Sequence, residues 1–205
     1  MFKFFKKIYK PLFCFCLCFF SVFVLIGCLG GQTNDTSSGK KSGKRSSALH
    51  QEMAIGSEAP DFTAKLNNGE AFTLSDKKGQ VILLNFWATW CPPCKAEMPD
   101  IQKLYEKSST EGEDAVIVLG VAAPNMGQEG SEEEIAAFME EKGYTYPVLM
   151  DTEGELFASY GIMSFPTTFM IDRDGNVFGY VSGMLSADMM DSIVRQTLDG
   201  KMDQR

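Results

Sequence analysis

Histidine and cysteine are both scarce in the part of this chain that could fold. His50 is the only histidine among 205 residues, and four of the six cysteines lie within the first 28. The other two, Cys91 and Cys94, form a Cys-x-x-Cys pair. One cysteine pair and one distant His are too few for a four-ligand zinc site, and one cysteine pair is too few for a scaffold held together by several disulfides. We therefore expect no metal and no other cofactor, and we interpret the pair as a redox centre.

Positive charge is sparse beyond residue 52. Residues 1–52 hold eight Lys or Arg and two acidic residues, a net charge of +6. The whole chain carries −8 at pH 7, so the remaining residues carry −14. Such an acidic body repels phosphates, and it has no basic stripe interleaved with aromatic residues. The sequence therefore argues against nucleic acid as a partner.

The first 27 residues are predicted to be a signal peptide. Four lysines in the first ten residues precede 17 uncharged residues, 11–27, which are rich in Phe, Leu, Val and Cys. A basic start followed by an apolar run is the layout of an export signal. A membrane-spanning helix needs about 20 apolar residues, so an uncleaved anchor is an alternative if Cys28 and Leu29 extend the run.

The end of the apolar run suggests a lipid anchor. Leu25-Ile26-Gly27-Cys28 resembles the lipobox of bacterial lipoproteins, in which the Cys is lipidated and becomes the mature N-terminus. The alternative is that Cys28 is an ordinary apolar residue of a signal anchor. Small and polar residues at 30–47 predict a flexible linker. We therefore expect 28–52 to tether a domain, 53–205, to the extracytoplasmic face of a bacterial cell membrane.

From residue 61 onward, short apolar runs alternate with helical periodicity, which predicts an α/β fold. The predicted strands are Phe62–Leu66, Ala71–Leu74, Val81–Ala88, Ala115–Ala122, Pro147–Met150, Thr167–Ile171 and Val177–Val181. The predicted helices are Pro92–Lys107, 131–142, Glu155–Tyr160 and Ala187–Leu198. Asn67-Asn68-Gly69 predicts a turn that joins the first two strands in an N-terminal hairpin. The nearly continuous apolar run at 81–88 predicts the sheet centre, covered on both faces.

The segment around the cysteine pair carries a family resemblance. Phe86–Pro99, with the sequence FWATWCPPCKAEMP, resembles the active site of the thioredoxin superfamily, and more narrowly of TlpA/ResA-type membrane-tethered thiol-disulfide oxidoreductases. Gly56–Phe62 (GSEAPDF), Phe165–Asp172 (FPTTFMID) and the following Asp174-Gly175 agree with it. The resemblance covers about residues 53–200.

The resemblance implies more than the spacing alone can show. It implies a thioredoxin-like fold, in which a central mixed β-sheet is flanked by helices and preceded by the N-terminal hairpin. It places the cysteine pair at the N-terminus of the first main helix. It also implies that Pro166 is cis and faces the pair, whereas an X-Pro bond on its own is cis only in a minority of cases.

Cys91 is predicted to be the nucleophile. A cysteine at a helix N-terminus meets unpaired backbone N–H groups and the positive end of the helix dipole, which stabilise its thiolate. Cys91 attacks a substrate disulfide, and Cys94, about one turn further on, resolves the mixed disulfide. Pro92 and Pro93 supply neither an N–H nor a positive charge, so we expect the potential of a reductant.

Glu97 is predicted to exchange a proton with the thiol during resolution, since it follows Cys94 by three residues on the same helix. In TlpA/ResA-like proteins a Glu at this place tunes the reaction, and the resemblance carries that role to Glu97. Thioredoxin itself has a buried Asp where this chain has Asn85, which cannot accept the proton. The alternative for Glu97 is a solvated helix charge beside Lys95.

Trp90, Phe165 and Pro166 are predicted to bind substrate. Trp90 stands beside the nucleophile and could offer an apolar platform to an extended polypeptide. Phe165 precedes the cis Pro166 of the resemblance and could offer backbone groups for strand-like pairing. Packing residues are the alternative for the two aromatic side chains.

These observations predict an extracytoplasmic thiol-disulfide oxidoreductase that reduces protein disulfides and draws electrons from a CcdA-like membrane thiol carrier. Family precedent suggests apocytochrome c or a methionine sulfoxide reductase as the substrate, and a monomer is the default. A thiol peroxidase is an alternative because Gly56–Phe62 is shared with peroxiredoxin-like proteins, although these place Pro and Thr where Leu84 and Ala88 stand. A binding module without turnover is a third interpretation.

Overall fold

The computed structural model describes residues 53–109, 111–112 and 114–202, which belong to one compact unit spanning 46–205. The predicted signal peptide, the lipidation site Cys28 and the linker at 30–47 lie outside the described residues. Among the residues described, no helix is long and apolar enough to cross a bilayer.

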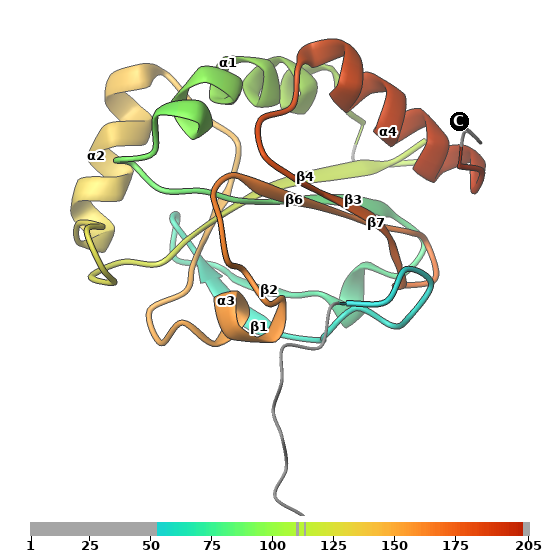
Figure 1. Ribbon diagram of the computed structural model, residues 1–205, viewed down its shortest axis with the longest axis horizontal. Coiled ribbons are helices and arrows are strands. Elements are labelled where there is room, and N and C mark those ends of the chain that lie inside the picture. Colours follow the sequence, from blue (N-terminus) through green and yellow to red (C-terminus); the bar gives the residue numbers. More distant parts are fainter. Residues whose placement is uncertain (1–52, 110, 113, 203–205) are drawn as a thin grey trace, which may run out of the picture. The chain divides into compact units, whose positions relative to one another are not determined.

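Seven strands of the described chain form one mixed sheet in the order β2-β1-β5-β4-β3-β6-β7 (Figure 1). The strands are β1 (Thr63–Leu66), β2 (Ala71–Thr73), β3 (Val81–Phe86), β4 (Val116–Ala122), β5 (Val148–Met150), β6 (Thr167–Ile171) and β7 (Val177–Ser182). The helices are α1 (Pro92–Lys107), α2 (Glu132–Lys142), α3 (Glu155–Ser159), α4 (Ala187–Asp199) and the 3-10 turn η1 (Ser75–Lys77). β3, β4 and β5 are parallel, and a hairpin closes each edge.

The thioredoxin-like α/β fold is confirmed, and the observed ends differ from the predicted ones by two residues or fewer. β3 ends at Phe86, because Trp87 and Ala88 leave the strand to begin the turn into α1. The middle of the sheet is β4, with β3 beside it. The turn η1 was not predicted, since three residues are too few to show a helical period.

β3 is buried on both sides, which explains its unbroken apolar sequence. Its side chains alternate between two hydrophobic clusters. Val81 and Leu83 point to one cluster, and Ile82, Leu84 and Phe86 point to the other. All six residues of the strand are buried, as expected when helices or loops cover both faces of a sheet.

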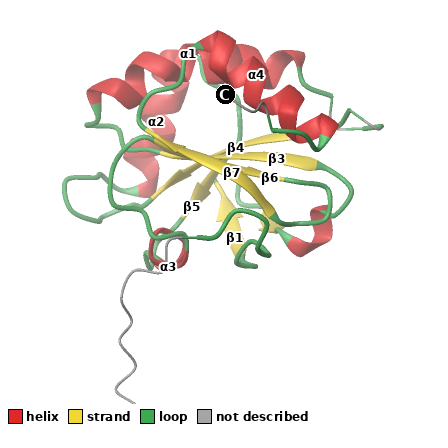
Figure 2. Ribbon diagram, turned by 45° about the vertical axis from the view of Figure 1, so that its right-hand side comes forward, coloured by secondary structure: helices red, strands yellow, loops and turns green. Residues whose placement is uncertain are grey.

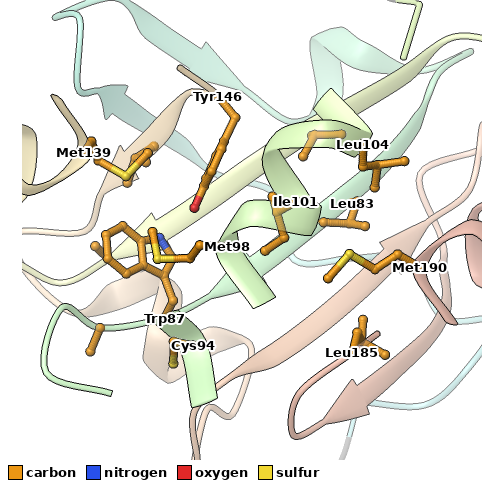
Figure 3. Packing of buried hydrophobic residues seen from close by; sticks show 14 of the residues in the cluster. Leu83, Trp87, Cys94, Met98, Ile101, Leu104, Met139, Tyr146, Leu185 and Met190 are labelled. Atoms are coloured by element: carbon orange, nitrogen blue, oxygen red, sulfur yellow. The ribbon is translucent and has the colours of Figure 1, made fainter. Parts of the chain in front are cut away.

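Helices cover the two faces unequally (Figure 2). α1, α2 and α4 pack on one face, which we call the active-site face, and their apolar side chains meet Leu83 and Trp87 there (Figure 3). The short α3 covers the other face, which we call the α3 face, where Leu156 and Tyr160 pack against Leu84 and neighbouring residues. The site described below is built on the active-site face and its edge.

Candidate active site

Cys91 and Cys94 lie at the start of α1 and form a disulfide, with their Cα atoms 5.3 Å apart. Cys91 is the N-cap residue, and its Sγ accepts the backbone N–H of Cys94 at 3.2 Å. Pro92 and Pro93 occupy the first helical positions and carry no N–H, so the N–H of Cys94 is the first helix donor that reaches this sulfur. The predicted position of the pair at the helix N-terminus is confirmed.

Glu97 lies inside the protein, one turn beyond Cys94 on α1. Its side chain is 1% exposed, so the alternative of a solvated helix charge is wrong. Burial raises the pKa of Glu97 above its ordinary value, because desolvation outweighs the hydrogen bonds that stabilise the carboxylate. A buried carboxyl with a raised pKa can hold a proton closer to neutral pH than a surface Glu can.

Two segments of the chain donate hydrogen bonds to the Glu97 carboxylate, and a third contacts one of the donors. Asn85 on β3 donates from Nδ2 to Oε1 of Glu97 at 2.8 Å, and to Oγ1 of Thr168 on β6 at 2.9 Å. The backbone N–H of Leu185, in the loop before α4, donates to Oε2 of Glu97 at 2.8 Å. Asn85 therefore positions Glu97, and the carboxyl group is fixed on both oxygens.

The predicted substrate-binding residues lie together at the edge of the site. The Phe165–Pro166 peptide bond is cis, as the resemblance implied. The Trp90 side chain is 41% exposed, and its ring meets the ring of Phe165 edge-on with a centroid distance of 5.8 Å. Phe157, at α3, extends this row with a centroid 5.6 Å from that of Phe165.

A hollow of about 230 Å³ opens beside this aromatic row. Its walls are mostly apolar and include Trp90, Met126, Phe157 and Phe165. In the described residues no group of three or more His, Cys, Asp or Glu is arranged to hold a metal ion. The cysteine pair at the start of α1 can support thiol-disulfide exchange.

The matched family covers both the cysteine pair and the cis-proline segment. Residues 55–179 match the AhpC/TSA family. The chain belongs to the AhpC/TSA family. This member is similar to the thiol-disulfide oxidoreductase ResA of Bacillus subtilis, at 35% identity over 140 residues that cover 68% of this chain and 74% of ResA. It is also 42% identical over 121 residues to the thioredoxin-like protein YneN of Bacillus subtilis, covering 58% of this chain and 66% of YneN.

Solved structures of similar sequence have the same fold. The pneumococcal exposed lipoprotein thioredoxin Etrx1 from Streptococcus pneumoniae superposes with a TM-score of 0.61 at 31% identity, covering 67% of this chain and 99% of Etrx1. StoA from Bacillus subtilis superposes with a TM-score of 0.57 at 30% identity, covering 65% of this chain and 96% of StoA. The protein is therefore a thiol-disulfide oxidoreductase of the thioredoxin superfamily.

Sequence reasoning missed several members of the site. Thr168 stands in the Phe165–Asp172 segment that carries the resemblance, so its nearness to Pro166 was a usable signal. The N–H of Leu185 left no signal, since a backbone donor has no residue type. Phe157 belongs to a helix of five residues that is too short for its buried side to be read from periodicity.

Proposed function

We propose that this protein is an extracytoplasmic reductase of protein disulfides, held at the membrane by a lipid on Cys28. The observation that carries the proposal is the Cys91–Cys94 disulfide at the N-terminus of α1, with the buried carboxyl of Glu97 one turn behind it. The catalytic roles of these three residues, and the division into 1–27, 28–52 and 53–205, are parts of the proposal.

The reaction transfers two electrons from the protein dithiol to the substrate. The Cys91 thiolate attacks one sulfur of the substrate disulfide, and the first substrate thiolate leaves and takes up a proton. Glu97 accepts the proton of Cys94, whose thiolate then attacks the sulfur of Cys91. The second substrate thiol is released, and the Cys91–Cys94 disulfide remains on the protein.

The direction of the reaction follows from the weak support of the Cys91 thiolate. A disulfide becomes strongly oxidising when its reduced form is specially stabilised. Here two prolines remove helix N–H donors from the space beside Cys91, and among the described residues only the N–H of Cys94 donates to its sulfur. The reduced form therefore gains little extra stability, which favours a low potential.

The name of a relative supports the proposed location. Etrx1, with which this chain superposes, is named an exposed lipoprotein thioredoxin, in agreement with the lipobox at Leu25–Cys28. We propose that Trp90, Phe165 and Pro166 receive the substrate polypeptide, which is apocytochrome c or an envelope enzyme such as a methionine sulfoxide reductase. A CcdA-like thiol carrier in the membrane restores the dithiol, and the protein acts as a monomer.

The deciding measurement is the reduction potential of the Cys91–Cys94 couple. We would equilibrate the full-length protein in detergent with dithiothreitol or glutathione buffers and trap the free thiols. The proposal expects a value near −270 mV or below, as in thioredoxin. A value near about −120 mV would identify a disulfide donor and reverse the proposed direction.

The peroxidase alternative has weaker support in the geometry. The two positions at which peroxiredoxin-like proteins place Pro and Thr are occupied by Leu84 and Ala88, which are both buried. Leu84 also points to the α3 face, away from the cysteine pair. Hydrogen peroxide consumption by the reduced protein tests this alternative, and turnover faster than protein disulfide reduction would favour it.

A further inference from the structure

Thr89, two residues before the nucleophile, is held by a carboxylate from a distant loop. The backbone N–H of Thr89 donates to Oε2 of Glu129 at 2.7 Å, and its hydroxyl donates to Oε1 at 2.5 Å. Both oxygens of Glu129 are thus used by one residue. Hydrogen bonds to an ionised carboxylate are about twice as strong as neutral ones, and a two-point contact also fixes orientation.

The loop that carries Glu129 is itself well fixed. The N–H of Asn125 donates to the carbonyl oxygen of Gly130 at 2.8 Å, which closes the loop, and the N–H of Gly130 donates to Oε1 of Glu129 at 3.0 Å. The next residue, Ser131, begins α2 with a capping box that also uses Glu134. Glu129 therefore lies in a loop between β4 and α2 that backbone hydrogen bonds close.

The contact has consequences for the two residues that follow Thr89. Trp90 and Glu129 line the same hollow, together with Met126. No described hydrogen bond fixes the Trp90 side chain, which stands 41% exposed against the edge of Phe165. Its direction is therefore set by the contact with Phe165 and by the backbone at Thr89, and the same backbone leads directly to Cys91.

We propose that Glu129 is a positioning residue of the thiol-disulfide reaction. It acts through Thr89, and it holds the segment Thr89–Cys91 so that Trp90 forms one wall of the hollow and Cys91 meets the substrate in a fixed direction. The proposal concerns the oxidoreductase activity itself and does not depend on the substrate or on the direction of electron flow.

The test uses variants of the full-length protein that remove the contact from either side. E129A removes both acceptors, and E129Q keeps one oxygen. T89A removes the hydroxyl and keeps the backbone donor, whereas T89S keeps both. The matched control is E132A. Glu132 stands three residues further on, its side chain pairs with Lys65 at 3.2 Å, and it does not line the hollow.

Two readouts separate positioning from loss of folding. The first is kcat/KM for dithiothreitol-driven reduction of insulin. The second is quenching of tryptophan fluorescence by acrylamide, which reports on Trp90 because Trp87 is fully buried. Thermal unfolding of each variant is recorded beside them. If the wild type does not reduce insulin, the proposed function fails, while quenching still tests the position of Trp90.

We expect E129A to lower kcat/KM by about tenfold, which corresponds to about 1.4 kcal/mol, and to increase acrylamide quenching. E129Q and T89A should fall between E129A and the wild type, and T89S should match the wild type. The double variant E129A/T89A should be no worse than E129A alone, because the two residues act through one contact. E132A should change neither readout.

Two results would overturn the proposal. One is an E129A protein whose kcat/KM and quenching equal those of E132A. The other is additivity of E129A and T89A, which would show that the two side chains act separately. If E129A does not fold, the pair T89A and T89S decides, since equal activity of these two would leave the contact without a role.

Discussion

The two faces of the sheet differ in whether the polar atoms of their buried aromatic side chains have hydrogen-bond partners. On the α3 face, Tyr160 is buried among apolar side chains, but its hydroxyl donates to the carbonyl oxygen of Pro60 at 3.1 Å. On the active-site face, the indole Nε1 of Trp87 and the hydroxyl of Tyr146 are buried with no hydrogen-bond partner among the described residues (Figure 3). The carboxyl group of Glu97 is buried on that face too.

We interpret the α3 face as the one that mainly stabilises the fold, and the active-site face as the one that carries the chemistry. A buried polar group without a partner costs about 1–3 kcal/mol. Strand β3 serves both faces, because Leu84 and Phe86 fill the α3 face while Asn85, between them, holds Glu97 on the other. We infer that apolar packing on the α3 face offsets the polar groups buried behind the cysteine pair.

Removing Cys91, the proposed nucleophile, should have the largest effect on activity and little effect on the fold. C91S should lower disulfide reduction by on the order of a thousandfold or more, since the serine hydroxyl cannot replace the thiolate. C94S should instead stop after the first step and accumulate a mixed disulfide with the substrate, visible on a non-reducing gel. A C91S protein that keeps substantial activity would show that Cys94 is the attacking residue.

Two neighbouring leucines of β3 allow the faces to be compared directly. Leu83 and Leu84 are both buried, and they point to opposite faces. L83A and L84A should each lower the free energy of unfolding by about 2–5 kcal/mol in urea titrations. Only L83A should also lower kcat/KM per folded molecule, because its cavity adjoins α1. A larger activity loss in L84A would contradict the division between the faces.

Gly120 on β4 tests how tightly the unpaired polar atoms are packed. A Cβ added there would lie 2.7 Å from Nε1 of Trp87 and 3.2 Å from the Tyr146 ring. G120A should therefore cost about 1–3 kcal/mol of stability through overpacking. Gly179 on β7 is the matched control, since its added Cβ would meet nothing within 4 Å. If thermal unfolding shows equal stability for G120A and G179A, the active-site face is looser than the structure indicates.

The sequence predicted the parts of the fold that follow from periodicity and the parts of the site that follow from motif. Strand β6 was predicted with its observed ends, and Cys91, Cys94 and the cis Pro166 followed from the motifs. The contacts made across the fold were not predictable. Glu129 is 40 residues from Thr89, and nothing in either local sequence indicates that the β4–α2 loop folds back onto the segment before Cys91.

The sequence also predicted the burial of Glu97 only in part. The apolar residues of α1 indicated that the helix faces a core, yet the depth of one carboxyl depends on Asn85 and on the loop before α4. These belong to segments that are far apart in the sequence. A local pattern can assign a residue to a helix face, but it cannot show which distant groups will surround it.

Replacing Glu97 should have the smallest effect on the free energy of unfolding. It measures most directly how much stability is lost by burying a carboxyl group on the active-site face. The folded pKa of Glu97 lies above its ordinary value of 4.5, mainly because of burial. As the pH rises above about 4.5, the unfolded chain releases the proton of Glu97 while the folded protein still holds it. The contribution of Glu97 to the stability of the wild type therefore falls through this window and levels off above the folded pKa.

E97Q has no proton to release, so its free energy of unfolding should rise relative to that of the wild type over the same window. Urea titrations between pH 4 and pH 8 measure the difference, in which the other carboxylates cancel. E58Q is the control, because it removes a carboxylate that is exposed at the surface. A flat difference between E97Q and the wild type would show that burying this carboxyl costs nothing, and the two faces would then differ in chemistry but not in stability.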